Sequence, residues 1–133
     1  MIKQTFLFIL LFLLTGFSYS YAIEPEQITF VHVGLKDGLS QNTVFSIDQD
    51  QRGNMWFATY DGVNKYDGYS FTVYRHDSAD SHSIANDIAR IVKVDSKGRV
   101  WIGTRDGLSY YDEEKDCFRN YFYEKRGKRI QIS

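Results

Sequence analysis

Residues 50–63 read DQRGNMWFATYDGV, and residues 95–108 read DSKGRVWIGTRDGL. The two stretches align without a gap at an offset of 45 residues. The identical positions are Asp50/Asp95, Gly53/Gly98, Trp56/Trp101, Thr59/Thr104, Asp61/Asp106 and Gly62/Gly107. A period of about 40–50 residues is typical of propeller blades rather than of helical or leucine-rich arrays. The spacing therefore predicts two consecutive blades of one propeller.

The similarity extends beyond this core stretch on both sides. Matching pairs are Asn42/Asp87, Ile47/Val92, Tyr66/Tyr111 and Asp67/Asp112, followed after a two-residue insertion by Phe71/Phe118 and Tyr74/Tyr121. We therefore assign blade 1 to residues 40–84 and blade 2 to residues 85–124. Residues 125–133 are the expected start of a further blade, which would make this chain a truncated piece of a longer protein.

Each unit contains four stretches of strand composition separated by turns. The expected strands are Thr43–Asp48, Met55–Tyr60, Val63–Tyr66 and Ser70–Arg75, then Ile88–Val94, Val100–Arg105, Leu108–Tyr111 and Cys117–Tyr123. Four antiparallel strands make one blade. The predicted fold class is all-β, an incomplete β-propeller of two four-stranded antiparallel blades. An orphan strand at Ile28–Val33 is expected in the segment 23–39 that precedes them.

The repeated residue types suit structural roles. Asp can accept backbone N–H bonds within a turn, Gly permits positive φ, and a small residue before Thr lets neighbouring strands or blades approach closely. The structural motif consists of Asp50, Gly53, Trp56, Thr59 and Gly62, and of Asp95, Gly98, Trp101, Gly103, Thr104 and Gly107.

Composition fits a strand-rich fold and excludes some partners. Apolar residues make up 43% of the chain and aromatic residues 17%, and only one residue is proline. Tyr, Phe and Trp are enriched in pleated, half-buried sheets. The net charge of −1 gives no electrostatic footprint for nucleic acid, so we expect no nucleic-acid binding by this segment.

Residues 1–22 have the pattern of a helical signal peptide. Lys3 provides the positive charge, Phe6–Leu14 the apolar stretch and Ser20–Ala22 a small-x-small cleavage site. The alternative is an uncleaved anchor, although the apolar stretch is short for a span of about 20 residues. The only cysteine, Cys117, has no partner for an intramolecular disulfide.

Catalytic interpretations of the conspicuous residues are weak. The two tryptophans could stack on a sugar, but a residue required in both repeats favours packing. Asp50 and Asp95 could be imagined as a hydrolytic pair, yet equivalent residues of separate blades favour turn capping. His32, His76 and His82 lack a metal-ligand spacing. We expect no catalytic residues, no metal and no cofactor.

Ligand or partner contacts are expected where connections meet at one end of the blades, because loops vary while blades hold position. The candidates are Gln41, Asn42, Tyr60, Asp61, Asn86, Asp87, Arg105 and Asp106.

The repeated residues resemble the two-component regulator propeller repeat, which is roughly D-x-x-G-x-(aliphatic)-W-(aliphatic)-G-T-x-x-G-(aliphatic)-x-x-(aromatic). Residues 95–111 fit this pattern throughout, and the first copy departs at Ala58, where the family prefers Gly. The stretch 30–42 also resembles the start of the sensor region of Bacteroides-type hybrid histidine kinases.

This resemblance implies the amino-terminal end of a periplasmic sensor that responds to carbohydrate. The parent would be anchored in the inner membrane, form a homodimer and carry a kinase core. The partners implied for this segment are the remaining blades and an oligosaccharide. Two alternatives stay open: the start of a secreted polysaccharide-active propeller enzyme, and a truncated gene product without function.

Overall fold

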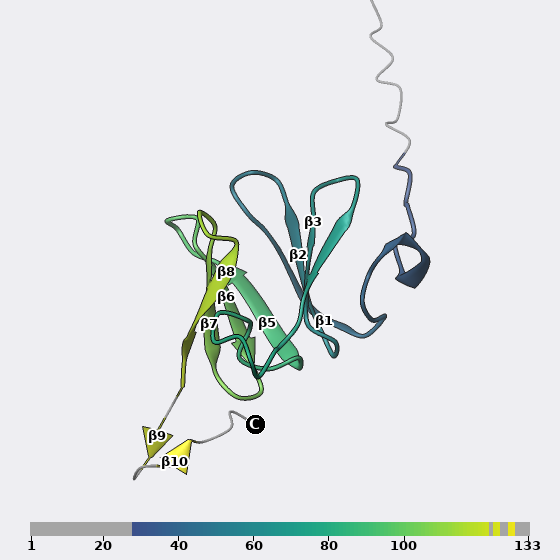
Figure 1. Cartoon of the computed structure of the whole chain (residues 1–133). Helices are drawn as coiled ribbons and strands as arrows, with labels where there is room; N and C mark the ends of the chain where they lie inside the picture. Colours follow the sequence, from purple (N-terminus) through teal and green to yellow (C-terminus); the bar gives the residue numbers. More distant parts are fainter. Residues whose placement is uncertain (1–27, 123, 126–127, 130–133) are drawn as a thin grey trace, which may run out of the picture. The chain divides into compact units, whose positions relative to one another are not determined.

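The computed structural model describes residues 28–122, 124–125 and 128–129 (Figure 1). The chain divides into two units, residues 1–31 and 32–133, and each is described by itself. The expected signal-peptide helix at residues 1–22 lies outside the described residues. Residues 28–34 have no regular secondary structure, so the expected strand at Ile28–Val33 is wrong. A strand needs a partner for its N–H and C=O groups, and none of the described strands pairs with this segment.

Eight strands of the second unit form two sheets with the same topology. The first holds β1 (Val44–Gln49), β2 (Met55–Thr59), β3 (Val63–Tyr66) and β4 (Phe71–Tyr74), and the second holds β5 (Ala89–Val94), β6 (Val100–Thr104), β7 (Leu108–Asp112) and β8 (Cys117–Tyr121). Sequential strands pair antiparallel in both, which confirms the predicted all-β class with two four-stranded blades. A 3-10 helix η1 (Leu35–Asp37) precedes β1, and β9 (Glu124–Lys125) pairs with β10 (Lys128–Arg129).

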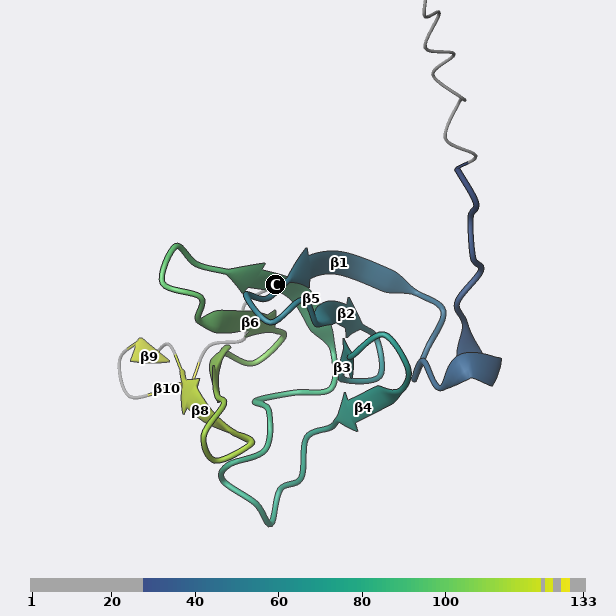
Figure 2. The same ribbon diagram turned by 90° about the horizontal axis from the view of Figure 1, so that it is seen from above.

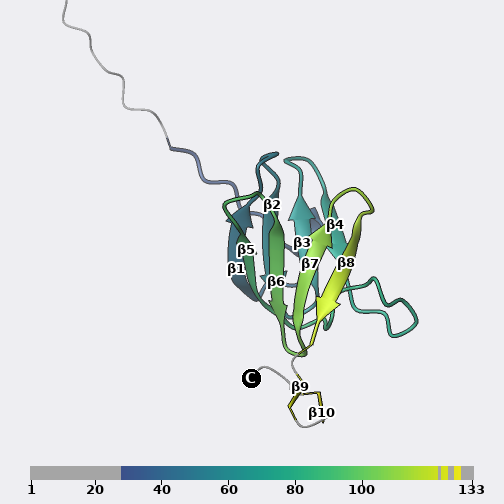
Figure 3. The ribbon, with the colours of Figure 1, turned by 90° about the vertical axis from the view of Figure 1, so that its left-hand side faces the viewer.

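The two blades pack face to face. Figure 3 shows blade 2 in front of blade 1 with the strands in the same order, and Figure 2 shows β1 beside β5. Contacts between β1 and β5 and between β2 and β5 join the sheets. The forward face of blade 1 is the face that blade 2 covers, and the rear face of blade 2 is the face that lies on blade 1. The opposite faces are the rear face of blade 1 and the forward face of blade 2. Blade 2 thus places its rear face on the forward face of blade 1.

The core lies between these two faces. Its fully buried members include Trp56, Ala58 and Val63 from blade 1 and Val92, Ile102 and Phe118 from blade 2. The Trp56 ring stacks on Tyr74, with centroids 5.9 Å apart, and meets the Tyr111 ring edge-on at 4.8 Å. Aromatic pairs of this kind add about 0.5–1.5 kcal/mol beyond their burial. The tryptophan of one blade is therefore buried by the tyrosine of the next.

Polar contacts also cross between the blades at their inner strands. The Ser46 hydroxyl donates to the Val92 carbonyl (3.2 Å), and the Asp48 carboxylate accepts from the Val94 N–H (2.9 Å) and the Lys93 ammonium (2.7 Å). These bonds fix the register of β5 against β1.

Burial of a repeat position depends on whether a neighbouring blade covers it. Val92, on the covered rear face of blade 2, is 1% exposed, whereas its equivalent Ile47 on the open rear face of blade 1 is 52% exposed. Val63, on the covered forward face, is 0% exposed, whereas Leu108 on the open forward face is 38% exposed. The described residues thus leave one face open at each side of the blade pair.

A buried aliphatic residue precedes each blade at the same repeat position. Leu39 and Ile84 are both buried, and the residue after each donates its backbone N–H to a side chain of the third strand. Ser40 donates to Asn64 Oδ1 (2.8 Å), and Ala85 donates to Ser109 Oγ (3.1 Å). We call Leu39 and Ile84 the plug residues.

Candidate functional site

The sequence candidates lie at one end of the blades, in the β2–β3 and β6–β7 turns and just before β1 and β5. Backbone bonds tie several of these segments together: the Gly62 N–H donates to the Asp87 carbonyl (2.7 Å), and the Arg105 N–H donates to the Ile88 carbonyl (2.9 Å). The Asn86 amide donates to Asp106 Oδ2 (2.8 Å), while Asp106 Oδ1 has no partner among the described residues. The two turns therefore rest on the segment before β5.

The remaining candidates at this end are engaged locally or face solvent. Asp61 forms a two-point ion pair with Arg75 (2.9 and 2.8 Å). Gln41 accepts from the Thr43 N–H, and the Asp87 carboxylate accepts from the His76 N–H (2.6 Å). Asn42 and Arg105 are exposed.

Two residues that sequence reasoning missed contribute an exposed aromatic and cationic surface here. Both β1 and β5 carry a register shift at the same repeat position, between Val44 and Ser46 and between Ala89 and Ile91. The residues at these shifts are Phe45 and Arg90. Bulges re-aim side chains and recur beside functional sites. No sequence signal marks such a shift, because the strand still alternates on either side of it.

The re-aimed side chains meet Tyr60 from the β2–β3 turn. The Phe45 and Tyr60 ring centroids lie 4.9 Å apart, and the Arg90 guanidinium lies 5.5 Å above the Phe45 ring. Phe45 is 39% exposed and Tyr60 46%, and Arg90 is also exposed. We call these three residues the loop-end cluster. It presents flat apolar surface beside a fixed positive charge, an arrangement suited to stacking a ring and donating hydrogen bonds.

The opposite end of the blades holds the Asp-containing hairpins. Asp50 accepts from the N–H groups of Arg52 (3.0 Å) and Asn54 (2.9 Å) and from the Trp56 indole (2.9 Å). Asp95 makes the equivalent bonds with Lys97 (2.9 Å), Arg99 (3.0 Å) and the Trp101 indole (3.1 Å). Each Asp thus holds both its turn and the tryptophan of the following strand.

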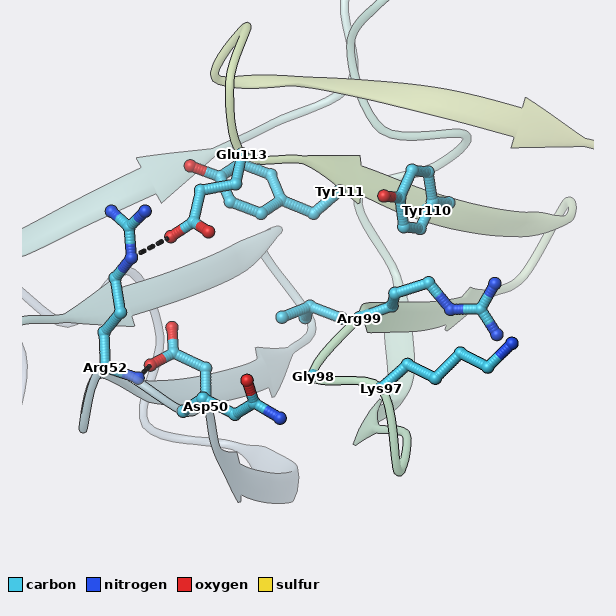
Figure 4. Close-up of a pocket in the computed structure, with 10 residues that line it drawn as sticks. Asp50, Arg52, Lys97, Gly98, Arg99, Tyr110, Tyr111 and Glu113 are labelled. Carbon is cyan, nitrogen blue, oxygen red and sulfur yellow. Dashed lines mark hydrogen bonds and ion pairs between the residues drawn. The ribbon is translucent and has the colours of Figure 1, made fainter.

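A groove of about 370 Å³ lies between these hairpins (Figure 4). The Arg52–Glu113 ion pair (2.9 Å) spans it from blade 1 to blade 2, and Lys97 and Arg99 extend in the opposite direction in Figure 4. Arg99 pairs with Asp95 (2.6 Å) and lies over the Trp101 ring. The Arg52–Glu113 pair joins the first hairpin to the β7–β8 turn, and the Arg99–Asp95 pair lies within the second hairpin.

A tyrosine pair shares one carboxylate across the blades. The Tyr74 and Tyr111 hydroxyls both donate to Asp116 Oδ1 at 2.6 Å, and Asp116 has φ +49°. Burial and the bond to Asp116 raise the pKa of Tyr111 to about 12. The bonds from Tyr111 and Tyr74 lower the pKa of Asp116. The next residue, Cys117, is a partly buried free cysteine at the start of β8.

Lowered carboxyl pKa values predict acid sensitivity. Burial acts to raise the pKa of Asp50, but the bonds from the Trp56 indole and from Asn54 outweigh it and lower the pKa below the ordinary 3.8. Stability from this ionised group is therefore present above pH 3.8 and is lost as pH falls through the folded-state pKa. We expect the melting temperature to fall steeply between about pH 4 and pH 2, and Asp50→Asn to flatten part of that fall.

This prediction is checked by thermal unfolding across a pH series. At pH 7 the Asp50→Asn variant should be about 1–2 kcal/mol less stable than the natural chain, because a neutral amide accepts fewer and weaker bonds. Asp77→Asn, in an exposed loop, serves as the control and should leave the fall of the melting temperature at acid pH unchanged. The same fall of the melting temperature at acid pH in Asp50→Asn and in the natural chain would contradict the role given to the Asp50 carboxylate.

Several of the described carboxyl groups have lowered pKa values. Where a carboxyl pKa departs from its ordinary value it is lowered, as in Asp61, where the bond from Arg75 is the main cause. A general acid at neutral pH needs a raised pKa. Among residues 28–122, no three His, Cys, Asp or Glu side chains gather in a way that could hold a metal ion. The described part of the chain likewise contains no helix with the length and apolarity needed to span a membrane.

The fold and its Asp-anchored tryptophans define two consecutive propeller blades. Residues 38–61 match the model of the family "Two component regulator propeller". A 49-residue stretch is 51% identical to a histidine kinase (Histidine kinase P4) of Formosa agariphila, over 37% of this chain and 4% of that protein.

Two solved structures with a similar fold are extracellular domains. One, from a putative hybrid two-component system of B. thetaiotaomicron, is 34% identical with a TM-score of 0.65, over 75% of this chain and 14% of that chain. Another, from a putative one-component system of the same organism, is 18% identical with a TM-score of 0.60, over 76% and 15%. Residues 38–61 thus carry the two-component regulator propeller repeat, and the chain is similar to the extracellular domain of a putative hybrid two-component system of B. thetaiotaomicron. It spans a small part of these relatives' length.

Proposed function

We propose that this chain is the exported, ligand-sensing propeller part of a hybrid histidine kinase and is not itself an enzyme. The observation that carries the proposal is the 34% identity over 75% of the chain to an extracellular domain of a hybrid two-component system. The apolar stretch and cleavage pattern of residues 1–22 support export to the periplasm. The parent would be anchored in the inner membrane and signal as a homodimer.

We propose a carbohydrate as the ligand, with the loop-end cluster as part of its binding surface. Exposed Phe45 and Tyr60 rings offer apolar faces of the kind that sugar C–H surfaces cover, and Arg90 adds hydrogen-bond donors beside them. The neighbouring polar candidates supply further contacts around this surface: Gln41, Asn42, Asp61, Asn86, Asp87, Arg105 and Asp106. The remaining blades of a longer chain would complete the pocket.

The sensor assignment is tested by the DNA that follows the codon for Ser133. We expect the parent gene to encode further blades, a membrane-spanning helix and a histidine kinase core. A downstream region without these features in any reading frame would remove the assignment. This test is independent of the ligand, because a parent kinase could sense another class of molecule.

The ligand proposal predicts weaker saccharide binding when the loop-end cluster is truncated. Isothermal titration of the parent's complete propeller with defined neutral and uronic-acid oligosaccharides should detect binding, and Tyr60→Ala should weaken it at least about tenfold, equivalent to about 1.4 kcal/mol. Tyr69→Ala is the control, since Tyr69 is 94% exposed in the β3–β4 turn at the other end of the blade. Equal weakening by both substitutions, or no binding by any saccharide, would count against the ligand proposal.

A further inference from the structure

The loop-end cluster lies on the strands where the two blades approach each other most closely. Phe45 is in β1 and Arg90 is in β5, and each of these strands is the edge strand of its sheet. The main contacts between the blades are made by β1, β2 and β5. Figure 2 shows β1 beside β5, with β4 and β8 spread apart. In a closed propeller, blades that spread in this way surround a central channel. Further blades would pack on the open faces and not on the inner edge formed by β1 and β5.

Arg90 is an exposed cation without a counter-charge. Its guanidinium lies 5.5 Å above the Phe45 ring and makes no ion pair or hydrogen bond with any of the described residues. Arg105 is also exposed, and its backbone N–H donates to the Ile88 carbonyl (2.9 Å), two residues before Arg90. The Arg105 guanidinium likewise has no acid partner in the described part of the chain. Two unpaired guanidinium groups are therefore present at this end of the blades.

The acidic candidates at the same end are already engaged within the chain. Asp61 is paired with Arg75 through both carboxylate oxygens. Asp87 Oδ1 accepts from the His76 N–H (2.6 Å), and Asp106 Oδ2 accepts from an amide side chain of the segment before β5 (2.8 Å). The other carboxylate oxygen of Asp106 is buried. The ionic groups without any partner at this end are thus the two guanidinium groups, which suits an anionic ligand.

The stacking of Arg90 on Phe45 orients the guanidinium beside an apolar surface. A planar guanidinium presents parallel N–H donors that match the oxygens of an oxyanion such as a carboxylate or a sulfate ester. Because this fork is pre-organised, less conformational entropy is lost for each hydrogen bond that it forms. Tyr60, with its ring centroid 4.9 Å from that of Phe45, extends the apolar surface. A sugar ring that carries an acidic group matches both features of the cluster.

We propose that the loop-end cluster selects an acidic saccharide, with the Phe45 and Tyr60 rings against the sugar and the Arg90 guanidinium bound to its carboxylate or sulfate ester. This inference rests on the proposed carbohydrate function and names the class of carbohydrate. Arg105 adds positive charge at the same end, which favours the approach of anions. A neutral saccharide would leave the Arg90 N–H groups to water and gain only the ring contacts.

Matched pairs of oligosaccharides test the charge preference. The parent's complete propeller is titrated calorimetrically with uronic-acid and sulfated oligosaccharides, each compared with its methyl-esterified or desulfated form of the same length. The acidic member of at least one pair should bind at least about tenfold more tightly, and that pair identifies the acid group as carboxylate or sulfate. Equal affinities within every pair that binds overturn this inference and leave the carbohydrate proposal standing. No binding by any member overturns both.

Substitutions at Arg90 test whether the cluster causes the preference. Arg90→Gln should reduce the affinity of the acidic member to that of its neutral form. Arg90→Lys keeps the charge without the planar fork and should restore part of the difference. A preference that survives Arg90→Gln overturns the proposal.

Lys97→Gln is the matched control for these variants. Lys97 is an exposed cation in the β5–β6 turn at the opposite end of the blades, and its ammonium has no ion pair among the described residues. Its replacement should leave the preference for the acidic member unchanged. A loss of preference equal to that of Arg90→Gln would indicate attraction by the overall charge and overturn the proposal. Cooperative melting of each variant confirms that it folds.

Discussion

Trp56→Ala is expected to lower the free energy of unfolding by about 3–5 kcal/mol, whereas Trp101→Ala should cost about 1–2 kcal/mol. Both indoles donate to the Asp of the preceding turn, so both variants lose the same hydrogen bond. Trp56 is 0% exposed and packs on Tyr74 and Tyr111, whereas Trp101 is partly exposed. The difference between the two losses therefore measures burial by the neighbouring blade.

Denaturant unfolding of the two variants at the lowest practicable concentration provides the measurement. A matched loss at both positions would mean that the blade contact contributes little and that the motif acts within each blade alone. A larger loss at Trp101 would contradict the packing described for Trp56.

Gly62→Ala is expected to destabilise the chain by about 3 kcal/mol or more, enough to unfold a marginally stable domain. Gly62 has φ +88°, and a Cβ there would lie 2.2 Å from the Tyr74 carbonyl oxygen, a backbone atom that cannot move aside alone. Its N–H also donates to the Asp87 carbonyl (2.7 Å), which ties the β2–β3 turn to the segment before β5. The substitution should disturb both blades.

Gly68→Ala separates backbone strain from the steric clash. Gly68 has φ +99°, and a Cβ there would meet no atom within 4 Å. This variant should cost about 1–2 kcal/mol, from the positive φ alone. Thermal and denaturant unfolding of Gly62→Ala and Gly68→Ala check the prediction. Comparable losses of stability in the two variants would show that the clash of the added Cβ with the Tyr74 carbonyl oxygen is relieved at low cost.

The sequence repeat predicts the strands well because hairpin turns and alternation are local properties. The third strand of blade 1, Val63–Tyr66, coincides with the observed β3, and the other strands differ by two residues or fewer at either end. The strand expected at Ile28–Val33 is wrong because its composition is suitable but none of the described strands pairs with it. Local signals cannot supply a missing partner.

The surroundings of each repeat could not be predicted in the same way. Trp56 and Trp101 are identical in the motif, yet only Trp56 is fully buried, since burial depends on the blade beside it. The loop-end cluster depends on bulges at Phe45 and Arg90, which the alternation of apolar and polar residues along the strands does not reveal. The sequence candidates at the same end, such as Asn86 and Asp106, did follow from the order of strands and turns, and their ligand role remains a proposal.

The plug residues have a consequence for how such chains lengthen and shorten. Because Leu39 and Ile84 occupy matching positions ahead of the first strand of each blade, the transferable module begins at the plug and not at the strand. Gene duplication that copies the chain from the plug residue onward includes the following backbone N–H, which donates to the third strand. A breakpoint after Ala85 leaves the Ser109 hydroxyl without this donor. Designed insertions should therefore join immediately before Ile84.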